Sequence, residues 1–259
     1  MVVAGCDVGS LSAEAVIMDN GSIISFEIIT VRPRPEQSAG DVMNAALSKA
    51  GLTLDDIDYC ISTGYGREKI PFANNNISEI SCHGKGAQWL IPSVRTVIDV
   101  GGQDCKAISV DENGNLQNFI MNDKCAAGTG RFLEVMSKTL GVGLEELASL
   151  AVISKNPLPV TSQCSIFTET EAMCYVNEGE KMADIAAGIN QAMARRVKAL
   201  VGRIGIVEEV CMTGGVAKNS GVVKSLEEIL KVQIKKMPED PQIIGALGAA
   251  IFAKEEAQK

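Results

Sequence analysis

The chain has 259 residues, of which 46% are hydrophobic and 22% are charged, so it can form one large or two ordinary soluble domains. Its formal net charge of −8 argues against a nucleic-acid or anionic-membrane binder, because such proteins need a cationic surface. The longest nearly pure apolar run, 243–253, is too short to span a bilayer, and the start, MVVAGCDVG, lacks the basic region of a signal peptide. We therefore expect a cytoplasmic protein with no nucleic-acid or membrane partner.

Two stretches of the chain repeat one another at the scale of a domain. AGCDVGSLSAEAVIMDNGSIISFEI begins at residue 4, and TVIDVGGQDCKAISVDENGNLQNFI begins at residue 96. Each predicts a strand, a glycine turn, a strand, a polar turn and a third strand. The matched pairs are Asp7 with Asp99, Gly9 with Gly101, Asp19 with Asp111 and Gly21 with Gly114. The sequence therefore predicts an α/β protein with two related halves facing a cleft, where small ligands bind.

Periodicity and capping residues predict the other elements in chain order. They are a helix at 38–51, a strand at 59–66, helices at 130–140, 166–178 and 184–205, a strand at 208–219 and a helix at 243–256. In the helix at 184–205 we expect Asp184 as N-cap, Gly205 as stop, and Arg195, Arg196 and Lys198 on a solvated face. The domain boundary is placed near residue 94, giving domains 1–93 and 94–242, with the helix at 243–256 completing the first.

The repeated D-x-G turns point to phosphate and magnesium chemistry. Glycines let backbone N–H groups approach phosphate oxygens, and the aspartates would hold Mg²⁺, mostly through its waters. Two ordinary hairpins are the alternative. Gly214 and Gly215 form a third turn, between a strand and a helix, against which a nucleotide base can lie. The candidate residues are Asp7, Gly9, Ser10, Leu11, Ser12, Asp99, Gly101, Gly102, Gly214 and Gly215.

Eight cysteines occur, and none forms a CxxC pair, so free thiols are expected. Cys6, Cys60 and Cys211 lie in apolar runs typical of small buried hydrophobes. Cys125 and Cys164 each lie in a polar, small-residue stretch just before a helical pattern. The stretch NDKCAAGTGRF, 122–132, has residues for a phosphate loop and a cysteine for a metal, and its residues alone leave both readings open.

The motifs between these pieces carry a family resemblance over essentially the whole chain. STGYGRE, SEISCHGKGA, IDVGGQD, MNDKCAAGTGRFLEVM, MTGGVAKN and GALGAA together resemble the BadF/BcrA-type ATPases, within the superfamily of actin, Hsp70 and sugar kinases. That family includes activators of 2-hydroxyacyl-CoA dehydratases, ATPase subunits of benzoyl-CoA reductases and reductases of double-cubane-cluster proteins. The resemblance implies two actin-like (ribonuclease H-like) ATPase domains and an ATP-driven one-electron reductase.

The resemblance also implies a homodimer with one bridging [4Fe–4S] cluster. Its ligands would be Cys125 and, from SQCSIFTETE, Cys164 of each chain. A cubane needs four thiolates, and a twofold axis doubles the two that one chain offers. Gly128, Thr129 and Gly130 would then face the nucleotide cleft. The implied partners are an iron–sulfur dehydratase or reductase as electron acceptor and a ferredoxin or flavodoxin as donor, with ATP or ADP and Mg²⁺ as ligands.

Several further roles follow from this resemblance, each with an ordinary alternative. Gln103 and Asp104 would orient the attacking water, although Gln103 can also be a plain turn residue. Lys106 would touch a phosphate or point outward from its strand. The roles assigned to the remaining residues are ribose binding or helix capping for Glu145 or Glu146, contact with the base for Gln242, and a structural or interfacial role for His83.

One departure concerns the first hairpin. Similar activators carry Ser-Thr-x-Ser-Lys after the first D-x-G, whereas this chain has Ser10, Leu11, Ser12, Ala13 and Glu14. A carboxylate in the lysine position would repel phosphate if it faced inward, while the backbone amides of 9–12 can still bind the β-phosphate. This favours a less usual partner, such as a double-cubane protein, over a standard dehydratase.

Two other functions remain open on the same fold. A small-molecule kinase is one, although sugar kinases usually have longer chains with substrate-specific insertions. A cluster-free actin-like ATPase is the other, and it gives Cys125 and Cys164 no function.

Overall fold

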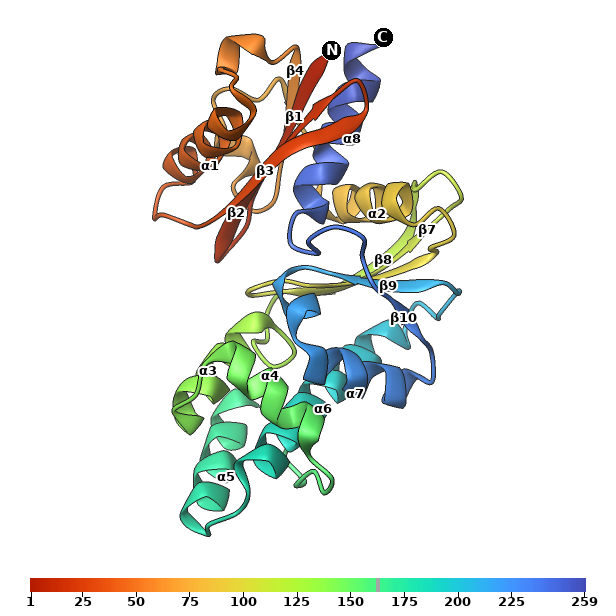
Figure 1. The fold of residues 1–259 in the computed structure, drawn as a ribbon. Helices are drawn as coiled ribbons and strands as arrows, with labels where there is room; N and C mark the ends of the chain where they lie inside the picture. Colours follow the sequence, from red (N-terminus) through yellow and green to blue (C-terminus); the bar gives the residue numbers. More distant parts are fainter. Residues whose placement is uncertain (162–163) are drawn as a thin grey trace.

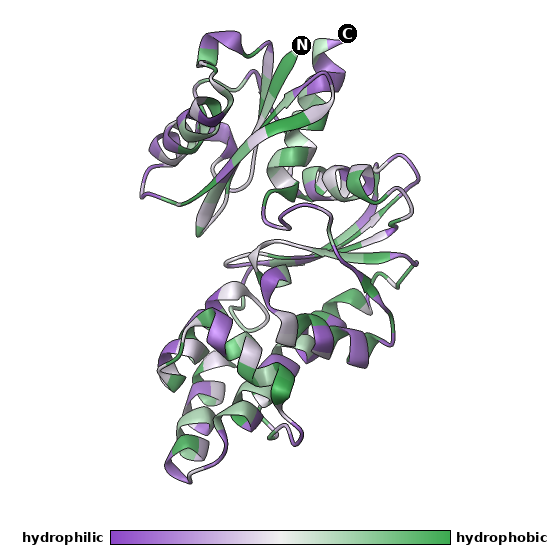
Figure 2. Ribbon diagram, in the orientation of Figure 1, coloured by the Kyte–Doolittle hydropathy of each residue, from purple (hydrophilic) through white to green (hydrophobic). Residues whose placement is uncertain are grey.

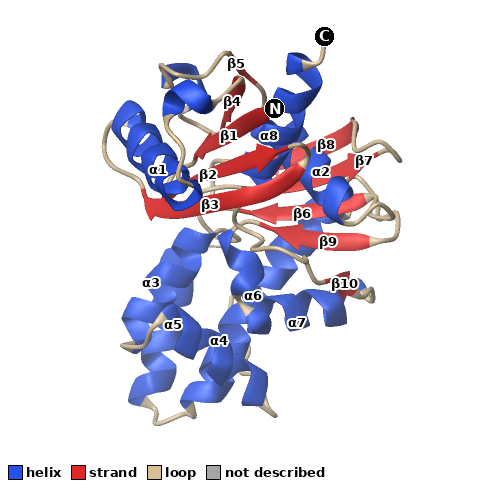
Figure 3. Cartoon of the chain, turned by 45° about the horizontal axis from the view of Figure 1, so that its top comes forward, coloured by secondary structure: helices blue, strands red, loops and turns tan. Residues whose placement is uncertain are grey.

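The computed structural model describes residues 1–161 and 164–259, and the residues it describes form two five-stranded sheets (Figures 1 and 3). The first sheet has the order β3-β2-β1-β4-β5 and the second the order β8-β7-β6-β9-β10, so corresponding strands take the same places. This confirms the internal repeat. The strands are β1 Val2–Val8, β2 Ser12–Asp19, β3 Ser22–Thr30, β4 Tyr59–Thr63, β5 Asn75–Asn76, β6 Thr96–Val100, β7 Cys105–Val110, β8 Leu116–Asn122, β9 Val210–Thr213 and β10 Ile234–Lys235.

The hairpins of the two copies are built alike. In the first, Gly9 N donates to Ser12 O at 3.0 Å; in the second, Gly101 N donates to Asp104 O at 3.1 Å. The polar turns that follow contain Gly21 at φ +86° and Gly114 at φ +76°, a left-handed backbone that glycine adopts without strain.

Helices distinguish the two halves. The first half has α1 Pro35–Ala50 between β3 and β4, whereas the described residues between β8 and β9 of the second form a helical part of four helices, drawn below the sheets in Figure 1. Cys125 and Cys164 lie in this added part. The remaining helices are α2 Glu79–Leu90, α3 Gly130–Leu140, α4 Leu144–Ile153, α5 Ser165–Asn177, α6 Met182–Val201, α7 Ser220–Leu230 and α8 Ile244–Ala257.

Two helices cross between the halves. α8 packs on β1, β2 and β4 of the first sheet, and α2 packs on the second sheet, mainly against β7. The two helices also pack on each other through glycines, because a Cβ atom at Gly248 would overlap the Cys82 carbonyl. In Figure 2, α8 is hydrophobic along this packed length and hydrophilic toward the C-terminus. The proposed boundary near residue 94 falls between the two sheets. Helix α2 precedes this boundary but packs on the second sheet, and helix α8 follows it but packs on the first sheet.

The helix at 184–205 was predicted with the wrong ends. α6 begins at Met182 with Lys181 as its N-cap, and Asp184 lies in the first turn, where it accepts a hydrogen bond from Ser154 Oγ at 2.6 Å. It ends at Val201, before Gly205. The predicted strand at 208–219 is likewise shorter, because β9 ends at Thr213 and a 3₁₀ turn, Gly215–Lys218, follows.

The solvated face predicted for α6 is also wrong for its arginines. Arg195 and Arg196 are half-buried, and Arg195 Nη2 donates to the Val160 carbonyl at 2.6 Å. Lys198 is exposed, as expected. Within the described residues, none of the helices combines the length and apolar character needed to cross a membrane.

Candidate functional site: a cleft between the two sheets

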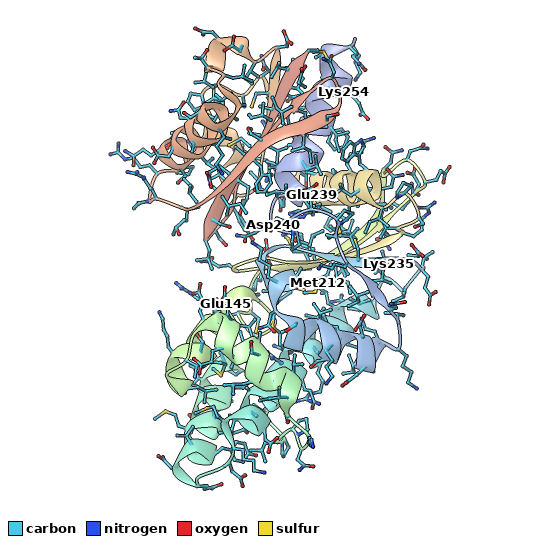
Figure 4. All side chains as sticks on the ribbon, in the orientation of Figure 1. Glu145, Met212, Lys235, Glu239, Asp240 and Lys254 are labelled. Atoms are coloured by element: carbon cyan, nitrogen blue, oxygen red, sulfur yellow. The ribbon has the colours of Figure 1, made fainter. Side chains whose placement is uncertain are left out.

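A cleft of about 470 Å³ lies between the two hairpins and is lined from both halves. That volume is in the range of small-ligand sites, about 300–1,000 Å³. Leu11 of the first hairpin reaches Gly102 of the second, where a Cβ atom would come within 2.6 Å of Leu11 Cδ1. Glu145 lies at the end of the helical part nearest the sheets, and Asp240 lies on the connection between the lobes (Figure 4).

The two repeated aspartates face a single histidine across the cleft. Asp7 and Asp99 end β1 and β6 and are 6% and 2% exposed. His83 of α2 is between them, with Nε2 4.0 Å from Asp7 Oδ2 and Nδ1 3.5 Å from Asp99 Oδ1. His83 is buried and also lines the cleft, and the structural or interfacial role stays a prediction.

Around Asp99 the site is cationic and strongly hydrogen-bonded. Buried Lys106 lies 3.2 Å from Asp99 Oδ2 and 2.7 Å from Asp104 Oδ2, so it points inward rather than outward. Thr213 Oγ1 donates to Asp99 Oδ1 at 3.0 Å. Burial alone would raise the pKa of Asp99, but His83, Lys106 and the Thr213 hydrogen bond outweigh it and lower that pKa. Asp99 is therefore a carboxylate at neutral pH.

The corresponding place in the first half is acidic. Strand register pairs Asp7 with Glu14, just as it pairs Asp99 with Lys106. Glu14 is 4% exposed and lines the cleft, so the inward orientation considered from the sequence is the observed one. Burial raises the pKa of Asp7 to about 6, despite the opposing effect of His83. The two halves have thus diverged at matched positions, with a lysine in one and a carboxyl group in the other.

Gln242 joins Glu14 to the opposite side of the cleft. Its Nε2 donates to Ser12 Oγ at 3.1 Å and to Glu14 Oε1 at 3.3 Å. Its Oε1 accepts from Lys218 Nζ at 2.9 Å, and Lys218 also pairs with Asp240 at 2.7 Å. Gln242 therefore lies beside the first hairpin and the Gly215 turn together.

Replacing Glu14 should stabilise the fold in a pH-dependent way. Burial, and next the charge of Asp7, raise the pKa of Glu14 well above its usual value. A carboxyl group with a raised pKa does not destabilise the fold at a pH below its unfolded pKa of about 4.3, where it is protonated in both states. As the pH rises from there toward the folded pKa, the group lowers the free energy of unfolding by an increasing amount. We expect Glu14→Gln to unfold at a higher temperature than wild type at about pH 7.5, with a smaller difference at about pH 5. Thermal unfolding followed by circular dichroism measures both.

The matched control is Glu112→Gln, since Glu112 is exposed on the turn between β7 and β8. It should leave the unfolding temperature nearly unchanged at both pH values. A Glu14→Gln protein that is less stable than wild type at the higher pH would contradict the prediction.

Most residues singled out from the sequence line this cleft. They are Asp7, Gly9, Ser10, Leu11, Ser12, Asp99, Gly101, Gly102, Asp104, Gly130, Glu145, Gly214, Gly215 and Gln242. Of the residues proposed for nucleotide binding or hydrolysis, four are not in its lining: Gln103 and Glu146 are exposed, Thr129 is fully buried, and Gly128 lines a separate cavity beside Arg196. The catalytic role of Gln103 stays a prediction.

The sequence reasoning missed Gly64 and Tyr65, which line the cleft after β4. Gly64 has φ +83°, and a Cβ atom there would strike Asp7 Oδ1; Gly214 has φ +82°, with Asp99 Oδ1 and the Val100 carbonyl as its near neighbours. Both follow a threonine, Thr63 or Thr213, at the end of a strand. This shared Thr-Gly pair was the available signal that the repeat extends past its hairpins.

Three of the eight cysteines are accessible. Cys125 and Cys164 are half-buried and Cys174 is exposed, whereas Cys6, Cys60, Cys82, Cys105 and Cys211 are buried. Burial raises the pKa of Cys60 to about 12 and that of the other buried thiols well above their usual range, so these are poor thiolate ligands. Cys164 is the N-cap of α5; Ser162 and Gln163 of its motif lie outside the described residues.

The Cys125 loop is tied to the second hairpin by backbone. Gly130 N donates to Gly101 O at 2.8 Å, and Arg131 N donates to Gly102 O at 2.9 Å. These are the first two amides of α3, so the helix that follows Cys125 begins directly on the hairpin. A displacement of this hairpin would move the start of α3 and the cysteine loop with it.

Among the residues that the structure describes, no three His, Cys, Asp or Glu side chains gather in a group that could hold a metal ion.

The sequence matches the protein family described as BadF/BadG/BcrA/BcrD ATPase family over residues 4–253. It is 44% identical over 260 residues to the 2-hydroxyisocaproyl-CoA dehydratase activator of Clostridioides difficile, covering 100% of this chain and 97% of that protein. The crystal structure of the Acidaminococcus fermentans (R)-2-hydroxyglutaryl-CoA dehydratase component A is similar at a TM-score of 0.96, with 42% identity and 100% coverage of both chains. The activator of the 2-hydroxyisocaproyl-CoA dehydratase from Clostridium difficile with bound ADPNP gives 0.95, with 44% identity, covering 100% of this chain and 96% of that one.

Proposed function

Because the chain belongs to the BadF/BadG/BcrA/BcrD ATPase family, we propose that it is an ATP-hydrolysing iron–sulfur protein that delivers single electrons to a partner enzyme. Its two halves share the actin-like ATPase fold of that family. The observation that carries the proposal is the backbone link from the Gly101 hairpin to the helix that follows Cys125.

In the proposed nucleotide complex, the two hairpins hold the phosphates. Each closes its own turn through the glycine N–H, which leaves the following amides, at 10–12 and 102–104, to the phosphate oxygens. Asp99 and Asp7 would orient the waters of a Mg²⁺ ion, and Lys106 keeps Asp99 ionised. Because Lys106 points inward, it would also contact a phosphate. Asp104, which pairs with Lys106, would orient the attacking water together with Gln103.

The nucleoside would lie toward the helical part. Glu145 lines that end of the cleft, which supports ribose binding by Glu145 rather than by Glu146. Gly214 and Gly215, after β9, would accept the base against their backbone. Gln242 is bonded to Ser12 and Glu14, so its proposed contact with the nucleotide is made from beside the first hairpin.

Cys125 and Cys164 suit a shared cluster. They are partly accessible, and an arginine donates to Cys125 Sγ. Cys164 is the N-cap of α5, whose N-terminal end favours an anion, and Cys125 lies in the loop that leads into α3. Two copies would hold one [4Fe–4S] cluster through four thiolates, and the bound cluster would supply one-electron transfer. Ile166 and Phe167, next to Cys164 on α5, are 69% and 62% exposed, which favours burial against a second copy in a homodimer.

The acceptor would be an iron–sulfur dehydratase or reductase, and the donor a ferredoxin or flavodoxin. Similarity to dehydratase activators favours the dehydratase class over a double-cubane protein. A cytoplasmic location is part of the proposal. A small-molecule kinase remains the alternative, but the chain aligns over its full length with an activator and leaves little extra sequence for a substrate domain.

A chelation experiment tests the coupling of ATP to the cluster. Anaerobic protein is mixed with an iron chelator, with and without a non-hydrolysable ATP analogue, and the loss of the cluster absorption is timed. We expect the analogue to change the rate several-fold, since closing the cleft moves the Gly101 hairpin and the start of α3.

Colourless, iron-free protein from anaerobic cells would refute the iron–sulfur proposal, and a kinase or a cluster-free ATPase would be the remaining functions. A coloured protein whose chelation rate ignores the analogue would keep the cluster but remove the coupling.

A further inference from the structure

Arg196 makes a direct contact with a proposed cluster ligand. Its Nη2 lies 3.1 Å from Cys125 Sγ and donates a hydrogen bond to it. The arginine is fixed by its helix, since Met193 and Val197 on either side in α6 are buried at 0% and 1% exposure. The guanidinium therefore reaches the sulfur from a rigid element of the core.

The Cys125 loop is shaped to receive this side chain. Gly128 has φ +99°, and a Cβ atom there would lie 3.1 Å from Cβ of Arg196, so the loop closes on the arginine where only glycine fits easily. Asn122 Nδ2 donates to Cys125 O at 2.9 Å, and Thr129 Oγ1 donates to Ala126 O at 2.7 Å. The backbone of the loop is thus held at Cys125 and Ala126 by side chains from before and after them.

We infer that Arg196 is a positioning residue that sets the reduction potential of the cluster through its hydrogen bond to Cys125; this rests on the proposed function, which places the cluster there. Reduction adds one electron from the donor protein to an already anionic cluster. A cationic N–H donor on a ligating sulfur stabilises the more negative state, and so raises the potential. In a twofold dimer, each cluster would have two such donors.

A simple loop-holding role is the competing account of the same contact. It predicts that removing Arg196 lowers iron retention without changing the potential of the cluster that remains. The midpoint potential of the cluster therefore distinguishes the two roles, whereas the loss of activity expected from both does not.

The test measures the midpoint potential of anaerobic protein by electron paramagnetic resonance during stepwise reduction, together with iron per dimer. Arg196→Met should keep iron and lower the reduction equilibrium constant roughly tenfold, a shift of about 59 mV for one electron. Arg196→Gln, which keeps a neutral donor, should shift less. Lys198→Met is the matched control, because it removes the same charge from an exposed position on the same helix, and its shift should be small.

An unchanged potential in Arg196→Met would overturn the inference, and so would an equal shift in Lys198→Met, which would reveal a long-range charge effect only. If Arg196→Met loses its iron, the midpoint potential of Arg196→Gln is compared with those of wild type and Lys198→Met instead. Loss of iron in both would assign Arg196 a loop-holding role alone and also overturn the inference. Wild-type protein without iron would refute the proposed function itself.

Discussion

Anaerobically purified protein is expected to contain about four irons per two chains, and Cys125→Ser or Cys164→Ser is expected to lose nearly all of them. Each chain has two half-buried cysteines, Cys125 in the loop that leads into α3 and Cys164 at the start of α5, so four thiolates require two copies. A serine oxygen is a poor substitute for thiolate in holding such a cluster. Iron analysis, with the absorption spectrum and circular dichroism of each variant, measures the loss in folded protein.

Cys174→Ser is the matched control for this prediction. Cys174 is exposed on α5, about two and a half turns, roughly 14 Å, further along the helix axis than Ser165. Its replacement should leave iron content unchanged. Four irons in each chain, or wild-type iron in Cys125→Ser, would exclude a cluster shared between two copies.

The duplicated fold was predictable because each hairpin needs particular residue types at particular positions. An aspartate at a strand end, a glycine in the turn and a second glycine with positive φ recur at matched places, and the two sheets have the same strand order. In the described residues, four helices lie between β8 and β9, where the first half has α1 alone. For that part only local periodicity was available, which locates helices but leaves their ends uncertain.

The surroundings of α6 could not be predicted from its own pattern. Arg195 and Arg196 lie beside one another on a helix that also carries Lys198, and such a group is usually solvated. Their partners, the Val160 carbonyl and Cys125 Sγ, come from segments 35 and 71 residues away. Nothing within a helical turn of the arginines indicates that these loops pack there, so the contact depends on tertiary structure alone.

In the cleft, the repeat identified the matched residues, whereas the residues that one half supplies alone were reached only through the family resemblance, and Gly64 and Tyr65 were missed. Asp7 and Asp99 were found because they match. His83 comes from α2, whose position over the second sheet depends on the exchange of helices between the halves. Lys106 and Glu14 occupy equivalent places in the register but differ in charge, so the repeat alone did not settle whether their side chains face the cleft.

Asp99→Asn is expected to reduce Mg²⁺-dependent ATP hydrolysis by about 10²–10³-fold, the range found when one preorganised polar group is removed from a catalytic site. Asp99 is buried, its pKa is lowered chiefly by His83 and Lys106 against the effect of burial, and it receives hydrogen bonds from Lys106 and Thr213. An amide keeps the shape but removes the negative charge that would hold the metal's waters, and it leaves Lys106 with Asp104 alone. Phosphate release at saturating ATP and Mg²⁺ measures the loss.

The same change should leave Mg²⁺-free nucleotide binding intact or somewhat tighter, because it removes a negative charge near the phosphates. Asp111→Asn serves as the control: Asp111 follows β7 in the same repeat and accepts hydrogen bonds from Asn113, Asn115 and Gln117 of the turn and the start of β8, so hydrolysis should not change. Equal losses of binding and hydrolysis in Asp99→Asn would show that Asp99 only maintains the cleft. Hydrolysis near the wild-type rate would contradict a metal position beside the second hairpin. The difference in charge between Lys106 and Glu14 would then need another explanation.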